Sequence, residues 1–167
     1  MNRDASDADL PAIVQIFNQL LATTTIEWTD EVHTVSGRRQ WLHEHRERGD
    51  PVLVAVDDDG GGSVVGVAAY SDFRDVTKWP GYRFTVEHSV HVRQDRWGRG
   101  IGRSLLDALV ERARLAGKHV MVGAIDADNV ASIEFHRRIG FVEVARMPEV
   151  GFKHDRWLGL VFVQRVL

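Results

Sequence analysis

The sequence predicts an α/β fold with a mixed, mostly antiparallel central sheet flanked by helices, in a single domain. Three observations support this class. The first half of the chain carries short apolar runs separated by a glycine-rich turn, as hairpins do. The second half alternates strand, helix, strand, helix and strand patterns, which requires at least one parallel crossover. A length of 167 residues, with no internal repeat and no linker, is typical of one domain.

Two amphipathic segments near the N-terminus are expected to be helices. In residues 9–22 the proline Pro11 suits a first helical turn. The apolar residues there follow helical spacing: Ile13, Ile16, Phe17, Leu20 and Leu21. Residues 36–48 form a shorter and highly charged pattern that Trp41 and Leu42 anchor.

The next segments read as strands. Residues 51–56 and 63–70 are expected to form a hairpin across a turn at 57–62. A charged loop is expected at 71–81 and another strand at 82–93.

The second half begins with a glycine-rich turn at 98–102 that runs into a helix, which Gly117 is suited to end. The apolar face of this helix comprises Leu105, Leu106, Leu109, Val110 and Ala113. Residues 119–125 are then expected to form a strand and 129–139 a helix, followed by strands at 141–146 and 157–166.

Composition excludes several classes of function. Lys and Arg number 21 against 24 Asp and Glu, a net charge of −3, so we expect no nucleic-acid or anionic-membrane partner. The chain has no cysteine, which excludes disulfides, thiolate metal sites and a cysteine nucleophile. No apolar run approaches the ~18 residues of a membrane span, and the N-terminus lacks an apolar leader. A cytoplasmic protein is the simplest interpretation.

The glycine-rich turn is a candidate anion site. Unpaired amides and the helix dipole favour negative charge at a helix N-terminus, and Arg99 and Arg103 add positive charge there. A tight connection without a ligand is the equally weighted alternative. The dinucleotide pattern G-x-G-x-x-G fails, because Arg103 or Leu105 stands where its third glycine belongs. No Gly-Lys-Ser or Gly-Lys-Thr of a P-loop exists either.

Two blocks of the sequence, from Trp97 to Leu106 and from Asn129 to Phe141, resemble motifs of the GNAT superfamily of N-acetyltransferases. The run from Trp97 to Leu106 is similar to the acetyl-CoA motif Gln/Arg-x-x-Gly-x-Gly/Ala, with Gly100 and Gly102 as its glycines and Trp97 in place of Gln or Arg. The run from Asn129 to Phe141 resembles the segment that contacts pantetheine and ends in Gly-Phe. The resemblance implies one N-acetyltransferase domain with the GNAT fold over residues 1–167.

Within that superfamily, the phosphinothricin and methionine sulfone/sulfoximine acetyltransferases are most similar. Residues 82–90 resemble their Thr-Val-Glu-x-Ser-Val core, and residues 151–162 resemble their C-terminal segment. His91 stands where Tyr is usual, Asp155 where Gly is usual and Gly159 where Asp is usual. These departures bear on the identity of the substrate rather than on acetyl transfer.

The resemblance implies acetyl-CoA as acetyl donor and assigns it a set of binding residues. Main-chain groups beside a strand bulge would pair with pantetheine, and the glycine turn would hold the pyrophosphate. The residues so assigned are Val90, His91, Val92, Gly98, Arg99, Gly100, Ile101, Gly102, Arg103 and Asn129.

Glu87 is the candidate catalytic base. It is the one carboxylate in an otherwise apolar strand, where partial burial would raise its pKa toward a useful range. A structural pairing with Arg83 is the alternative. Without a bulge, strand alternation places Glu87, Ser89 and His91 on one face and His88 on the other. His136 could protonate the leaving thiolate, although packing is the favoured interpretation.

The expected amine substrate is a small amino acid analogue. Arg74 would hold its carboxylate, because a guanidinium matches a carboxylate bidentately, or would be a solvated loop arginine. Phe73, His88 and Ser89 would complete the substrate side, with His88 equally readable as a core histidine. The eight histidines offer no convergent pair, so no metal is expected. The resemblance also implies a homodimer. Acetylation of another amine or a protein N-terminus, and a non-catalytic acyl-CoA-binding module, remain the alternatives.

Overall fold

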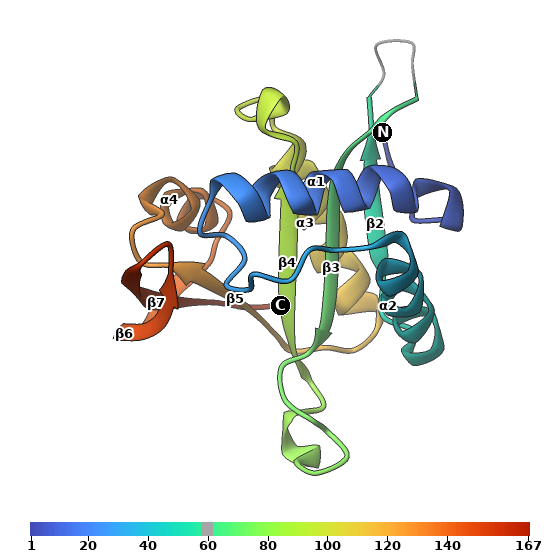
Figure 1. Cartoon of the computed structure of the whole chain (residues 1–167). Helices are drawn as coiled ribbons and strands as arrows, with labels where there is room; N and C mark the ends of the chain where they lie inside the picture. The colour runs from blue at the N-terminus through green and yellow to red at the C-terminus, as the bar shows by residue number, and fades with distance from the viewer. Residues whose placement is uncertain (58–61) are drawn as a thin grey trace.

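The structure is a computed structural model that describes residues 1–57 and 62–167. Within that part of the chain, seven strands form one sheet in the order β1-β2-β3-β4-β5-β7-β6. The pair β4–β5 is parallel and every other neighbouring pair is antiparallel. The predicted fold class is therefore confirmed, and the ribbon shows a twisted sheet with helices on both faces (Figure 1). The predicted turn at 57–62 lies for the most part outside the described residues.

The strands are β1 (Asn2–Asp4), β2 (Val52–Val56), β3 (Val64–Asp72), β4 (Thr85–Val92), β5 (Val120–Asp126), β6 (Val142–Lys153) and β7 (Arg156–Val166). The helices are α1 (Leu10–Thr23), α2 (Val35–Arg48), α3 (Ile101–Leu115) and α4 (Val130–Arg138). Short 3-10 turns lie at Asp7–Asp9, Pro80–Tyr82 and Gln94–Arg96.

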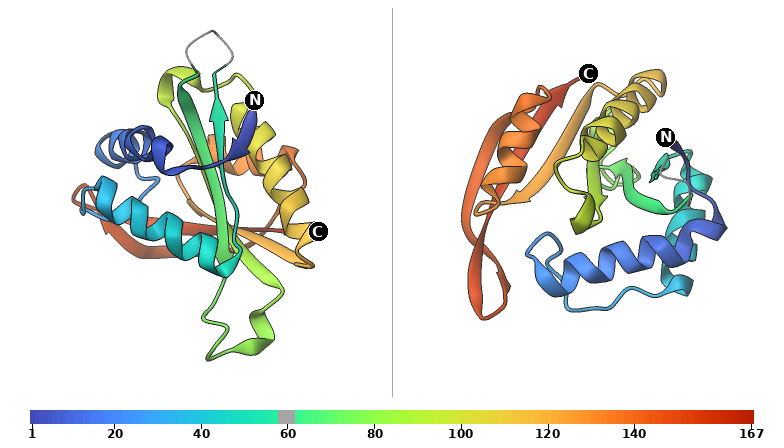
Figure 2. Two further views of the ribbon diagram at one scale, coloured as in Figure 1. Left: turned by 90° about the vertical axis from the view of Figure 1, so that its right-hand side faces the viewer. Right: turned by 90° about the horizontal axis from the view of Figure 1, so that it is seen from above.

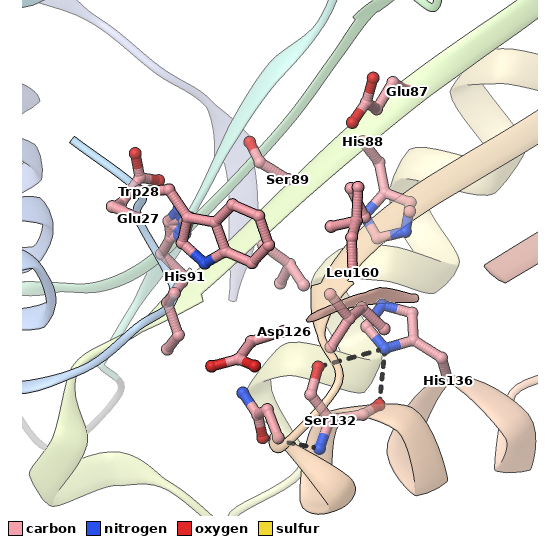
Figure 3. A pocket seen from close by; sticks show the side chains of 16 residues that line it. Glu27, Trp28, Glu87, His88, Ser89, His91, Asp126, Ser132, His136 and Leu160 are labelled. Atoms are coloured by element: carbon pink, nitrogen blue, oxygen red, sulfur yellow. Dashed lines mark hydrogen bonds and ion pairs between the residues drawn. The ribbon is translucent and has the colours of Figure 1, made fainter. Parts of the chain in front are cut away.

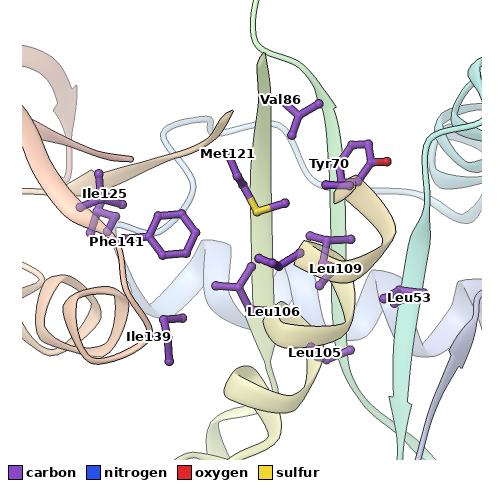
Figure 4. Packing of buried hydrophobic residues seen from close by; sticks show 14 of the residues in the cluster. Leu53, Tyr70, Val86, Leu105, Leu106, Leu109, Met121, Ile125, Ile139 and Phe141 are labelled. Carbon is purple, nitrogen blue, oxygen red and sulfur yellow. The ribbon is translucent and has the colours of Figure 1, made fainter. Parts of the chain in front are cut away.

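Helices α1 and α2 cover one face of the sheet, and α3 and α4 cover the other (Figure 2). The predicted stripe of α1 is buried against alternate residues of β2 and β3, such as Val54 and Val67. On the opposite face Leu105, Leu106 and Leu109 of α3 are fully buried against the sheet (Figure 4). Burial of each such leucine stabilises the fold by roughly 1.5–3 kcal/mol.

Two elements differ from the sequence expectation. Strand β1 was not predicted, because its three polar residues show no pattern and pair with β2 only through tertiary contact. Strand β6 continues to Lys153 instead of ending at Arg146. The pairing with β7 shifts between Met147 and Gly151, so the bulge contains Pro148. Proline is tolerated at such bulges and on edge strands, and β6 is the edge.

Strand β4 is regular along β3, which corrects the bulge that the resemblance suggested. Its register with β3 runs without a shift from Val86 opposite Asp72 to Val92 opposite Gly66. The irregularity lies on its other edge. There β4 pairs with β5 only from Thr85 to Glu87, after which the two strands separate. This separation positions the site.

Candidate active site

A cavity of about 410 Å³ lies where β4 and β5 part. Its walls come from segment 26–28 after α1, residues 87–91 of β4, residues 123–126 of β5, Asn129, Ser132 and His136 at α4, and Leu160 of β7. Beyond Glu87, β4 bonds to β3 and β5 bonds to β7, so the β4 edge that faces the cavity is not covered by β5. An uncovered strand edge presents main-chain donors and acceptors to a ligand.

Glu87 lies at the rim of this cavity and is half-buried (Figure 3). Burial raises the pKa of its carboxyl, and the positive charge of Arg74 partly opposes the rise. A carboxylate with a raised pKa beside a cavity is suited to accept a proton near neutral pH. Ser89 follows on the same face of β4, as the predicted alternation requires.

His88 lies on the opposite face of β4 and also lines the cavity. Its ring is buried against His136, at 5.2 Å between ring centroids, and against Phe141. Neither of its ring nitrogens meets a hydrogen-bond partner within the described residues. Burial lowers the pKa of His88 to about 3, so the ring is neutral. A Cβ on Gly123 would lie 2.7 Å from Nε2, so glycine is needed there.

His136 is a packed, neutral histidine whose tautomer the structure fixes. Its Nδ1 lies 2.7 Å from the main-chain oxygen of Ser132, which can only accept, so Nδ1 carries the proton. Burial lowers its pKa. Nε2 is therefore bare and has no proton to donate to a thiolate, which agrees with the packing interpretation rather than with the acid role.

The glycine-rich turn leads into α3 as predicted. Gly98 and Gly100 have φ of 76° and 78°, a left-handed conformation that favours glycine, and Gly100 is the N-cap of α3. The first amides of α3 are thus presented outward beside Ile101, Gly102 and Arg103. These residues do not line the cavity. They follow the C-terminal end of β4, and the uncovered edge of β4 leads from the cavity toward them.

Two of the side chains around this turn, those of Trp97 and Arg103, have partners. The indole Nε1 of Trp97 donates to the main-chain oxygen of Val92 at 2.7 Å, so Trp97 braces the turn and that carbonyl is engaged. Arg103 lies 3.5 Å from Asp107 on the surface of α3. Arg99 is exposed. The main-chain amides, more than the arginines, define the geometry of this end.

Asn129 lines the cavity as the N-cap of α4. Its Oδ1 accepts from the amide of Ser132 at 3.1 Å, which is the reason α4 begins there. This cap does not use the side-chain NH₂ group, which remains a donor toward the cavity.

Two of the predicted substrate residues do not line the cavity. Phe73 packs against the rings of Tyr82 and Phe162, and Arg74 lies 5.2 Å above the Phe73 ring in an exposed position. Arg74 still lies close enough to Glu87 for its charge to act on that carboxyl.

The sequence interpretation missed the segment between α1 and α2. Glu27 and Trp28 line the cavity from its α1 side, and Asp126 lines it from β5, held by Thr25 and by the amide of Asp128. The segment has no hydrophobic period and no motif. One feature of the sequence pointed toward this segment: His91 stands where the similar acetyltransferases usually have Tyr. In the structure, Nε2 of His91 lies 2.8 Å from Oε1 of Glu27.

Comparison with known proteins identifies the family. Residues 13–141 match the family described as Acetyltransferase (GNAT) family. The chain belongs to the GNAT acetyltransferase family. Over 162 residues it is 48% identical to an L-methionine sulfoximine/L-methionine sulfone acetyltransferase of Pseudomonas aeruginosa. The matched region covers 97% of this chain and 91% of the relative.

Solved structures of GNAT proteins superpose on the whole chain. A ribosomal-protein-alanine N-acetyltransferase of Brucella melitensis is 41% identical, with a TM-score of 0.94 over 100% of this chain and 99% of that one. A phosphinothricin acetyltransferase of Sinorhizobium meliloti in complex with acetyl-CoA is 34% identical, with a TM-score of 0.93 over 100% and 88%. The family assignment confirms the resemblance seen in the sequence.

Two features are absent from the described residues of this GNAT chain. None of its helices there is long and apolar enough to cross a membrane. In the same residues, no three potential ligands among His, Cys, Asp and Glu gather at one point as a metal site would need.

Proposed function

We propose that this chain is an N-acetyltransferase that transfers acetyl from acetyl-CoA to the amino group of a small amino acid analogue. The analogue is of the methionine sulfoximine, methionine sulfone or phosphinothricin type. The observation that carries the proposal is the cavity between the parted strands β4 and β5, with Glu87 at its rim. The relatives named above carry the same activity in their names.

The chemistry of the residues present supports acetyl-CoA as the acetyl donor. The uncovered edge of β4 at Val90, His91 and Val92 offers main-chain groups to pantetheine, with the Val92 carbonyl already engaged by Trp97. The side-chain NH₂ of Asn129 faces the same cavity. The turn from Gly98 to Arg103 presents amides to the pyrophosphate, and the helix dipole favours an anion there.

Glu87 acts as the base in this proposal. An α-amino group titrates near ~8, so most of it is a cation at neutral pH and cannot attack. Glu87 takes one proton from the ammonium, directly or through a water molecule. The amine nitrogen then attacks the thioester carbonyl in a ternary complex, the C–N bond forms and the C–S bond breaks. The nitrogen, which still carries an extra proton after the attack, releases it to solvent and becomes the amide. Because His136 has no proton to give, the thiolate of coenzyme A takes its proton from solvent.

The remaining assignments concern the substrate and the assembly. Arg74, beside Glu87, would hold the α-carboxylate, with Phe73 beneath it. Ser89 and His88 border the acceptor side. A cytoplasmic homodimer is proposed, and apolar side chains exposed on β6 and β7 support an interface between two copies. These are Val142, Val144, Met147, Val150, Phe152 and Trp157.

A thiol-release assay on the purified chain tests the function. Acetyl-CoA is offered with methionine sulfoximine, methionine sulfone, phosphinothricin, a polyamine and a peptide with an N-terminal alanine. Turnover of at least one of the three amino acid analogues, well above the other amines, is expected. Turnover of the peptide alone supports the second candidate, acetylation of a protein N-terminus, which the name of the Brucella neighbour favours. No turnover of any amine supports a non-catalytic acyl-CoA-binding module.

A further inference from the structure

The cavity holds a second carboxylate that acetyl transfer does not use. Glu27 enters it from the segment after α1, and its side chain is 24% exposed. Oε1 of Glu27 lies 2.8 Å from Nε2 of His91. No partner for its other oxygen, Oε2, is found within the described residues.

Glu27 is fixed both by its side chain and by its main chain. His91 is 5% exposed, and burial lowers its pKa to about 3, so the ring is neutral and donates Nε2–H to the carboxylate. The contact is therefore a hydrogen bond rather than an ion pair. The main-chain oxygen of Glu27 accepts from Nζ of Lys153 at 2.6 Å. The next residue, Trp28, packs against Gly151 of β6, where any Cβ would collide with the ring.

The charged residues that line the described part of the cavity are all acidic. Among the described residues that line it, the charged ones are Glu27, Glu87 and Asp126, with no lysine or arginine. The carboxylate of Asp126 is occupied by Thr25 and by the amide of Asp128. Burial raises the pKa of the Glu27 carboxyl, and the two cations whose charges oppose this rise, Arg38 and Lys153, lie outside the walls. An anionic group of a ligand at Glu27 would be repelled by the carboxylate, and no lysine or arginine of the described cavity lining would offset this repulsion.

The two carboxylates lie at opposite ends of one face of β4. Glu87 and His91 are four residues apart on that face, roughly 13 Å along the strand, and Ser89 lies between them. Figure 3 shows Glu87 at one end of the strand segment and Glu27 with Trp28 at the other. An amino acid bound near Glu87 with its side chain along this face, past Ser89, would point the end of that side chain toward Glu27.

We propose that Glu27, held by His91, contacts the far end of the substrate side chain and selects a hydrogen-bond donor there. This inference rests on the proposed N-acetylation of a small amino acid analogue. A sulfoximine carries an N–H at that end and can donate to the carboxylate. A sulfone has nearly the same shape but offers only acceptor oxygens, and phosphinothricin carries an anionic phosphinate. The expected order of preference is sulfoximine, then sulfone, then phosphinothricin.

Binding and turnover of the isosteric pair test this inference. kcat/KM is measured for methionine sulfoximine and methionine sulfone at saturating acetyl-CoA, in the wild-type chain and in Glu27→Gln. Wild type should favour the sulfoximine by roughly 10–100-fold, because a donor opposite a charged acceptor is lost with the sulfone. In Glu27→Gln the ratio should fall toward one, since an amide can donate to the sulfone oxygen, and phosphinothricin turnover should rise.

Glu31→Gln is the matched control, because Glu31 is exposed on the same segment and does not line the cavity. It should keep the wild-type ratio, and both variants should keep the KM for acetyl-CoA and the melting temperature. Equal use of the two analogues by the wild type, or an unchanged ratio in Glu27→Gln, would overturn the role of Glu27.

Calorimetric binding of the two analogues to the complex with coenzyme A separates this inference from the proposed function. Absence of turnover with preferential, Glu27-dependent binding of the sulfoximine would remove the activity and keep the binding role. Absence of binding by either analogue would overturn both.

Discussion

At the scale of single residues, the proposed role of Glu87 as the base depends on where β4 places it. It stands at the last paired position before β4 and β5 separate, so its carboxyl is half-buried yet borders a cavity. Burial raises its pKa above the ordinary ~4.3 of a glutamate. The base form is the carboxylate, which is lost as pH falls through this raised pKa. Activity should therefore decline on the acid side at a pH set by Glu87.

Glu87→Gln is expected to lower kcat by roughly 10²–10⁴, the usual contribution of a positioned base. The acid limb of the pH–rate profile should disappear with it, while the KM for acetyl-CoA stays unchanged. Arg74→Gln should instead move the limb to higher pH, because the charge of Arg74 lowers the pKa of Glu87. The thiol-release rate measured from pH 5 to 9 checks both. An acid limb that survives in Glu87→Gln would assign the titration to another group.

Residue types alone gave Glu87 and Ser89 correctly as neighbours on one strand face. They could not give Glu27 and Trp28, because no period or motif marks residues 24–34. They also left open whether His136 could donate a proton to the thiolate. That depends on which ring nitrogen carries the proton, and the hydrogen-bond partner of the ring decides it. Here that partner is the carbonyl of Ser132.

At the scale of elements, one buried lysine attaches the segment after α1 to the sheet. Nζ of Lys153, at the end of β6, donates to the main-chain oxygens of Leu21, Thr24 and Glu27 at 2.9, 3.2 and 2.6 Å. Two of these oxygens belong to the C-terminal end of α1, where a positive charge is favourable. The lysine is 5% exposed. It holds in place the wall that carries Glu27 and Trp28.

Lys153→Met should therefore cost stability and activity together. Three main-chain acceptors, one buried and two partly buried, lose a charged donor, a loss of about 3 kcal/mol in the free energy of unfolding. For a chain of this size that lowers Tm by roughly 10 °C. Lys78→Met, at an exposed lysine, is the control for thermal unfolding and should leave Tm within about 2 °C of wild type. Equal melting of the two variants would show that Lys153 does not anchor the segment.

Strand β6 shows why element boundaries are difficult to predict. Pro148 and Glu149 interrupt the apolar alternation, so the pattern ends near Arg146. The strand nevertheless resumes after a bulge, and Glu149 takes a φ of 54° within it. Pairing with β7 over residues 151–153 carries Lys153 to its buried position.

At the scale of the whole molecule, the exposed apolar side chains of β6 and β7 support the proposed homodimer. Large apolar side chains on one sheet edge are a typical interface feature. We predict that the chain sediments at twice its own mass and that Val150→Glu shifts it toward the monomer. Leu115→Glu, at an exposed leucine of α3, should leave the mass unchanged. Analytical ultracentrifugation over micromolar concentrations checks this, and a wild-type monomer throughout would contradict it.

The sequence by itself determined the fold class, the order of the helices and most strands, the glycine turn before α3, and the place of Glu87 on strand β4. Each of these depends on local information: hydrophobic period, turn residues and motif spacing. Tertiary structure decided the separation of β4 from β5, the tautomer of His136, and the entry of Glu27 into the cavity. Those features arise from contacts between residues far apart in the chain, as between Glu27 and His91 or Lys153 and Leu21, and no local pattern encodes them.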